Sequence, residues 1–118
     1  MTEIQNSKQS DLEDRTLDFA KRIRRYVKNL PKSMINFEVG KQLFRSAGSV
    51  GANYIEANEA LSKKDFVMRV KICRKEAKES RYWLRLSETN REEEEKNSLI
   101  GETIELTKIF GSILEKCI

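Results

Sequence analysis

The chain has 118 residues, and its 23 Lys and Arg outnumber its 19 Asp and Glu, so that its net charge is +4 at pH 7. This length corresponds to about one domain, and a hydrophobic content of 38% is enough for one modest core. With one proline and five glycines, the composition excludes a fold of many short strands joined by tight turns and favours a few long helices.

The first helix is expected after a polar tail, residues 1–9, that we predict to be disordered. Ser10 and Glu13 have the spacing of a capping box, and Pro31 ends the helix. Residues 10–118 are then a single helical domain. The inner side of the first helix recurs at steps of three and four and consists of Leu12, Thr16, Phe19, Ile23, Tyr26 and Leu30.

The second helix starts after Ser33, a residue type suited to the N-cap. Its inner side comprises Gly40, Leu43, Ala47, Val50, Tyr54 and Asn58. This periodicity continues through Gly48 and Gly51 and therefore places them in the middle of the helical segment, not in a loop. Their GxxG spelling therefore does not indicate a phosphate-clamping loop, which would also need strands that the sequence lacks.

The third helix follows Ser62, with Asp65 at the third position of the cap. Its inner side is Phe66, Val70, Cys73, Ala77, Ser80 and Leu84. The acidic run 92–95 suits the positive start of a fourth helix, whose inner side is Leu99, Thr103, Leu106, Phe110, Ile113 and Cys117. Four such helices with short connections predict an all-α, antiparallel up-down four-helix bundle.

The two interior glycines of the second helix need a structural reason, because each costs roughly 1 kcal/mol relative to alanine. Small side chains surround them, at Ser46, Ala47, Ser49 and Ala52. We interpret this turn as a place where neighbouring backbones approach closely, within the bundle or at an interface.

Positive charge is concentrated on the third helix. Residues 61–85 hold nine Lys or Arg and three acids, an excess of six, so that the rest of the chain is net −2. Five of the nine fall on one side of the helix: Lys71, Arg74, Lys78, Arg81 and Arg85. This basic ridge is either a solvated face with local pairs such as Lys75 with Glu79, or a stripe that binds nucleic-acid phosphates.

Basic residues of the first helix form a candidate second patch. These are Lys21, Arg22, Arg24, Arg25 and Lys28. Aromatic stacking platforms near the ridge are limited to Tyr82 and Trp83, so that sequence-specific recognition of single strands is poorly supported.

Apolar residues outside the inner stripes predict a homo-oligomer with Trp83 as an anchor. They are Met68, Ile72, Trp83, Ile100 and Ile104, and the candidate interface also takes in Ser46, Ser49, Asn53 and Glu56 on the second helix. Asn53 and Glu56 either bond across to a neighbouring helix or are solvated.

The chain contains no histidine, which removes the commonest general base and the usual transition-metal ligand. Glu56 with Glu59, and Glu76 with Glu79, are carboxylates three residues apart that no complementary ligand set faces. We expect no catalytic residue, metal or cofactor, and therefore a protein that is not an enzyme.

No apolar run reaches the roughly 18 residues that span a bilayer, and the start MTEIQNSKQSDLED is polar and acidic. We expect a cytoplasmic protein without membrane contact. Cys73 and Cys117 then stay reduced and act as small core residues.

The sequence also resembles a known family, the four-helix bundle proteins called 23S rRNA intervening-sequence proteins. The similarity lies in LPKS (30–33), KQLFRSAGSVGANYIEANEALSKKDF (41–66), KEAKESRYWLRL (75–86) and, weakly, ETIELTKIFGSIL (102–114). The most specific pieces are Arg45-Ser46, Gly51-Ala52-Asn53, Glu56-Ala57 and Tyr82-Trp83-Leu84.

This resemblance implies an antiparallel four-helix bundle that assembles as a ring-like homopentamer. The chain is also similar to accessory proteins of diversity-generating retroelements, whose basic pentamers bind nucleic acid and a reverse transcriptase. Our leading hypothesis is a non-enzymatic oligomeric bundle that binds nucleic acid, most readily structured RNA, through its basic face. The alternative is a protein-interaction scaffold or accessory subunit that binds another protein and no nucleic acid.

Overall fold

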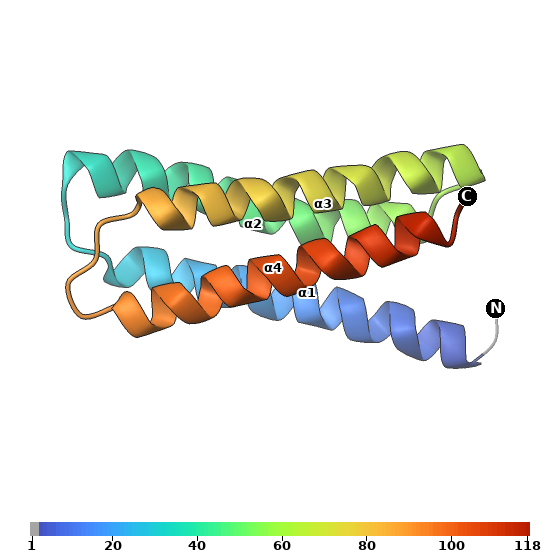
Figure 1. The fold of residues 1–118 in the computed structure, drawn as a ribbon, viewed down its shortest axis with the longest axis horizontal. Coiled ribbons are helices and arrows are strands. Elements are labelled where there is room, and N and C mark those ends of the chain that lie inside the picture. Colours follow the sequence, from blue (N-terminus) through green and yellow to red (C-terminus); the bar gives the residue numbers. More distant parts are fainter. Residues whose placement is uncertain (1–2) are drawn as a thin grey trace.

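The computed structural model describes the backbone of residues 3–118 and the side chains of residues 11–118. Its four helices are α1 (Glu3–Asn29), α2 (Met34–Asn58), α3 (Lys63–Leu86) and α4 (Glu93–Glu115). They run alternately up and down, and the start of α1 and the end of α4 lie at the same end of the bundle (Figure 1). Consecutive helices pack on each other and α1 also touches α4. The described backbones of the diagonal pairs stay apart, although the rings of Tyr54 on α2 and Phe110 on α4 meet in the core. The predicted four-helix bundle is confirmed.

Helix α1 begins earlier than the sequence indicated. Ser10 lies inside α1, which starts at Glu3, so that Ser10 and Glu13 do not cap it. The expected tail of residues 1–9 overlaps this helix from Glu3 on, whereas residues 1–2 lie outside the described part. The segment 3–9 contains no glycine or proline, and its Glu, Gln and Lys favour a helix without needing burial.

The predicted caps of the next two helices are confirmed. The hydroxyl of Ser33 accepts a hydrogen bond from the backbone N–H of Asn36 at 3.0 Å, and that of Ser62 accepts one from Asp65 at 3.1 Å. The first turn of α4 holds Glu93, Glu94 and Glu95, which favour the positive end of the helix dipole.

The core lies along the predicted inner sides. All six inner residues predicted for the first helix are buried, including Leu30 just after the end of α1, as are most of those predicted for the other helices. Asn58, Phe66, Ile113 and Cys117 are only half-buried because they lie near helix ends. Cys117 follows the end of α4 and is half-buried, so that the prediction of a core position for this thiol is wrong.

One buried amide joins the two turns at the end shown at the left of Figure 1. The Asn36 side chain donates to the carbonyls of Pro31 and Glu88, both at 2.8 Å, and accepts from the N–H of Glu88 at 2.9 Å. The α1–α2 turn is thereby tied to the segment between α3 and α4, 52 residues away in sequence.

The close approach predicted around the glycines occurs between α1 and α2, at Gly51. A Cβ on Gly51 would lie 3.0 Å from the hydroxyl of Thr16, and one on Gly40 would lie 2.9 Å from Val27. Gly48 differs, because a Cβ there would meet nothing within 4 Å. The expectation therefore holds within the described bundle for Gly51 and not for Gly48.

Candidate nucleic-acid interface

The basic ridge lies on the α4 side of α3. Lys71, Lys78, Arg81 and Arg85 are exposed and Arg74 is half-buried. Lys71 and Arg74 line a cleft of 380 Å³ with Gly111 and Leu114 of α4. From Lys71 to Arg85 the ridge is about 21 Å long at 1.5 Å per residue.

Several other cations of the bundle are neutralised by carboxylates of a neighbouring helix. Arg15 forms a two-pronged pair with Glu102, both bonds at 2.8 Å, and Arg22 bonds Glu95 at 2.9 Å. Arg45 bonds Glu76 at 3.1 Å and Glu79 at 2.6 Å.

The five ridge cations differ from these arginines. None of them forms an ion pair with any residue whose side chain is described. The local pair of Lys75 with Glu79, considered from the sequence, is also not formed, since Glu79 is engaged by Arg45 and by the Trp83 indole. The ridge is therefore a row of positive charge available to an external anion.

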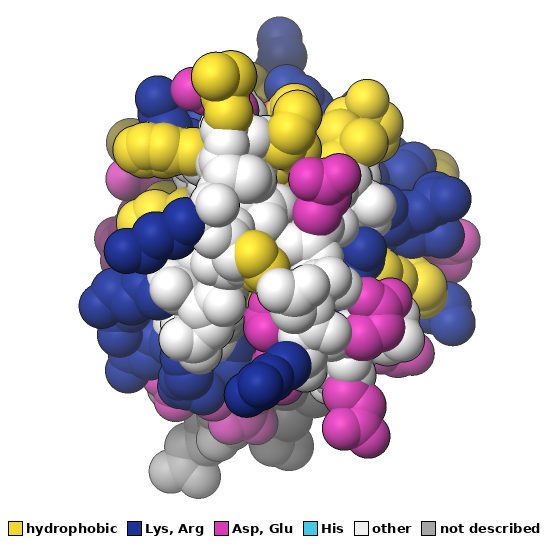
Figure 2. All heavy atoms as spheres, turned by 90° about the vertical axis from the view of Figure 1, so that its left-hand side faces the viewer, with side chains coloured by type: hydrophobic (Ala, Val, Ile, Leu, Met, Phe, Trp, Pro, Cys, Tyr) yellow, Lys and Arg dark blue, Asp and Glu magenta, His cyan; other side chains and the backbone are white. Residues whose placement is uncertain are grey.

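The candidate patch of α1 lies on the other side of the bundle. Lys21, Arg24, Arg25 and Lys28 are exposed, whereas Arg22 is half-buried and forms an ion pair with Glu95. Arg24 and Lys28 line a cleft between α1 and α2, and α1 and α3 are diagonal helices. Viewed from the end that holds the α1–α2 and α3–α4 connections, Lys and Arg gather on two opposite flanks (Figure 2).

The nine residues expected at an oligomer interface do not form one patch. Ser46 is fully buried, and its hydroxyl lies 2.8 Å from that of Ser80 on α3. Ile100 and Ile104 are half-buried and lie on α4, two to three turns before Gly111. The others, Ser49, Asn53, Glu56, Met68, Ile72 and Trp83, lie along the outer side of the α2/α3 pair.

A polar seam joins α2 and α3 on that outer side. Besides the Arg45 pairs, the Asn53 carbonyl accepts from Arg69 at 3.0 Å, so that Asn53 bonds across to a neighbouring helix while Glu56 is exposed. The Trp83 indole N–H donates to Glu79 at 3.1 Å. This hydrogen bond, together with the contacts to Glu76 and Arg45, lowers the pKa of Glu79.

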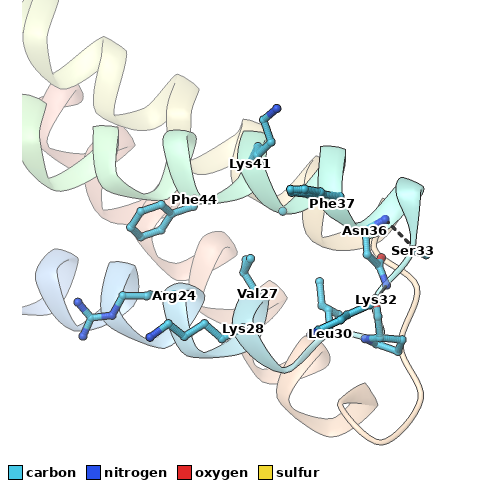
Figure 3. Close-up of a pocket in the computed structure, with 12 residues that line it drawn as sticks. Arg24, Val27, Lys28, Leu30, Lys32, Ser33, Asn36, Phe37, Lys41 and Phe44 are labelled. Carbon is cyan, nitrogen blue, oxygen red and sulfur yellow. Dashed lines mark hydrogen bonds between the residues drawn. The ribbon is translucent and has the colours of Figure 1, made fainter.

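A cleft between α1 and α2 was missed from the sequence. It has a volume of 680 Å³, and Val27 and Gly40, where the two helices approach closely, are among its lining residues. Phe44 and Val27 point into it, and Arg24 and Lys28 lie along its α1 edge (Figure 3). A second apolar stripe on the second helix, through Phe37 and Phe44 at a spacing of seven, was the signal that could have found it.

The structure gives no sign of a membrane segment or a metal centre in the part it describes. None of the helices is long and apolar enough to cross a bilayer. Across the described residues, no three His, Cys, Asp or Glu side chains gather where they could hold a metal ion.

Four antiparallel helices, a polar seam between α2 and α3, and a row of cations that no described carboxylate pairs define a basic four-helix bundle protein. The family model of the 23S rRNA-intervening sequence proteins matches residues 8–112, and the chain belongs to this family. A comparison with curated proteins found no match.

A solved structure supports the same assignment. It is a protein of unknown function from the S23 ribosomal protein family of Bacteroides thetaiotaomicron, 36% identical to this chain. The alignment covers 92% of this chain and 98% of that one, with a TM-score of 0.80.

Proposed function

We propose that this chain is a non-enzymatic, cytoplasmic nucleic-acid-binding protein that binds structured RNA through the basic ridge of α3. One observation carries the proposal. The five ridge cations share one side of a helix, and none of them is paired with a described carboxylate, whereas Arg15, Arg22 and Arg45 all are. The family name, which refers to sequences within 23S rRNA, agrees in kind with an RNA partner.

The expected mode of binding is charge attraction to the phosphate backbone without reading of bases. Each cation that neutralises a phosphate releases counterions, so that affinity falls as salt rises. The described ridge presents guanidinium and ammonium groups over about 21 Å and no aromatic ring of its own. We therefore expect little preference for base sequence and a preference for RNA whose folded shape places several phosphates along the ridge.

The test is a titration of the protein with a structured RNA hairpin, a duplex and a single strand at several salt concentrations. Engagement of all five ridge cations gives a slope of log affinity against log salt of about −4.5 on a duplex. Neutralising Lys78 and Arg81 to Gln is expected to reduce the slope by about 2. Binding that is absent at low salt, or that ignores these substitutions, contradicts the proposal.

A matched control is available on the same protein. Lys32 and Lys41 are also exposed cations, but they line the α1/α2 cleft, away from the ridge. The pair Lys32→Gln and Lys41→Gln removes the same charge, so that a larger loss from the ridge pair isolates position from net charge.

We also propose that the chain forms a homo-oligomer, a pentamer by resemblance, through the outer side of α2 and α3. Met68 and Leu86 are each 45% exposed there, and Trp83 is half-buried between them along the helix. Apolar groups left in water on one side usually mark a partner surface. Light scattering on Met68→Glu should then give a smaller assembly than the parent, with unchanged helicity; an unchanged mass contradicts this surface.

A protein-interaction scaffold that binds no nucleic acid is the competing function. The exposed rings and chains of α2, including Phe37 at 65% and Ile55 at 51%, favour it. Retention of a partner protein by a variant whose ridge is neutralised, together with undetectable RNA binding by the parent, would support this function over the first.

A further inference from the structure

A second apolar stripe runs along α2, turned away from the core. Phe37, Phe44 and Ile55 are 65%, 47% and 51% exposed, and Gly48 lies between the last two with open space above it. Their spacing of seven, four and seven residues keeps them on one side of the helix over about 27 Å. This is the length and spacing with which one helix packs along another.

The α1/α2 cleft lies at one end of this stripe and offers apolar surface inside. Val27, Leu30 and the rings of Phe37 and Phe44 contribute to its lining (Figure 3). Its polar groups are already used: Asn36 bonds three backbone groups, and Ser33 caps α2. An occupant therefore gains by inserting apolar groups, and a nucleobase would find no free partner there for its polar edge among the described uncharged side chains.

The rim of the cleft is positive. Its lining includes Arg24, Lys28, Lys32 and Lys41 and no carboxylate. The nearest ion pair, Lys41 with Glu38, is long at 3.8 Å, and both side chains are mostly exposed. An apolar occupant with carboxylates along its flanks fits both the interior and the rim.

We propose that the α1/α2 groove binds an amphipathic, acidic α-helix of another protein, with large apolar side chains of that helix seated against Phe37 and Phe44. A second copy of this chain fits less well. On its other apolar side, the carboxylates beside Trp83 are Glu76 and Glu79, which Arg45 already neutralises. The proposal does not depend on RNA binding, because the ridge lies on the opposite flank.

The test uses a labelled synthetic peptide of about 18 residues, long enough to follow the stripe, with Leu at heptad a and d positions and Glu flanking them. Fluorescence anisotropy with the full chain should show saturable binding that weakens as salt rises. A peptide with Lys in place of every Glu should not bind. Failure of the acidic peptide to bind, or equal binding of both peptides, overturns the proposal.

Matched variants locate the site. Phe37→Ala with Phe44→Ala should weaken the peptide at least about tenfold, and so should Arg24→Glu with Lys28→Glu. Lys78→Glu with Arg81→Glu makes the same charge change on the opposite flank and should leave peptide affinity within about twofold. Because both rings are exposed, helicity and Tm of the Phe variants should match the parent.

Two further outcomes separate other occupants. If the Phe37 and Phe44 variant loses oligomer mass while the peptide does not bind, the groove is an interface between copies. If it loses RNA affinity and RNA displaces the peptide, the groove is part of a nucleic-acid site. Either result overturns the proposal without touching the ridge experiments.

Discussion

Single residues at the α1/α2 contact decide how closely these helices approach. Gly51 and Gly48 lie three residues apart in the same helix, yet a Cβ on the first would press on Thr16 and a Cβ on the second would meet open space. Gly48 therefore shows only the intrinsic cost of glycine in a helix, whereas Gly51 combines this cost with a close packing contact that needs a glycine.

We predict opposite effects of alanine at these two positions. Gly48→Ala should stabilise the chain by up to about 1 kcal/mol, because only the helix propensity changes. The effect of Gly51→Ala should lie between no change and a loss of about 2 kcal/mol of folding stability, because overpacking against Thr16 opposes the gain in helix propensity. Urea unfolding of both variants checks this. Equal effects would show that the contact with Thr16 does not matter, and Thr16→Ala combined with Gly51→Ala should recover part of the loss.

The two thiols are expected to differ in reactivity. Burial raises the pKa of Cys73 to about 12, whereas Cys117 is half-buried at the end of the chain. At pH 8 the native protein should react with a thiol reagent once, at Cys117, and the denatured protein twice. Labelling followed by mass measurement checks the site. Rapid native labelling of Cys73 would mean that the core around it opens readily.

At the level of the helices, α2 and α3 are joined by charged and polar groups as well as by the core. Arg45, Ser46 and Asn53 of α2 meet Glu76, Ser80 and Arg69 of α3, mostly through hydrogen bonds of about 3 Å. Several of these residues belong to the segments that carry the family resemblance. Part of the family resemblance is therefore explained by residues that join α2 to α3 within the bundle.

The seam should make folding stability depend on pH. The pKa of Glu79 is lower in the folded chain than in the unfolded chain, so that its contribution is complete above the unfolded value, near 4.5, and is lost as pH falls through the folded value. Trp83 is the only tryptophan, and its indole bonds this carboxylate. Its fluorescence should therefore titrate with a midpoint below that of an ordinary glutamate.

Arg45→Met tests the charge part of this effect. Without Arg45 the fluorescence midpoint should rise, and stability at pH 7 should fall by about 1–2 kcal/mol, since Glu76 is buried but Arg45 is half-exposed. The substitution Gln42→Met, at an exposed position of the same helix, is a control for introducing a methionine. A midpoint that stays in place would assign the low pKa to the contacts with Trp83 and Glu76 and none of it to Arg45.

On the molecule as a whole, positive charge lies on two opposite flanks. The bundle measures 46 × 23 × 19 Å between Cα extremes, and the α1 patch and the α3 ridge belong to diagonal helices. A short, straight duplex can lie along one flank but cannot contact both.

We therefore predict that the two flanks act separately on RNA. If RNA binds as proposed, the ridge alone contacts a duplex of about 10 base pairs, so that Lys21→Gln with Arg25→Gln should change affinity much less than Lys78→Gln with Arg81→Gln. For a long folded RNA, the losses from the two pairs should add as free energies. Gel-shift titrations at one fixed salt concentration compare them, and equal losses on the short duplex would contradict separate flanks.

Much of the fold could be predicted from the chain because its signals are local. The steps of three and four, the caps at Ser33 and Ser62 and the stop at Pro31 depend on residues within one or two turns of each other. The start of α1 was misplaced because polar residues continue a helix as easily as they leave one. The ridge was also predictable, since five cations on one side of a helix are visible in their spacing.

Partnership between distant residues could not be predicted in the same way. Glu79 lies four residues after Lys75, so that the sequence favours a local pair between them. Only the packing of α2 beside α3 brings Glu79 to Arg45, 34 residues away. The α1/α2 cleft likewise exists because Gly40 and Val27 bring two helices together below the rings of Phe37 and Phe44. Periodicity places a side chain on a face of its own helix, whereas the orientation of the helices about each other determines which groups remain free to bind.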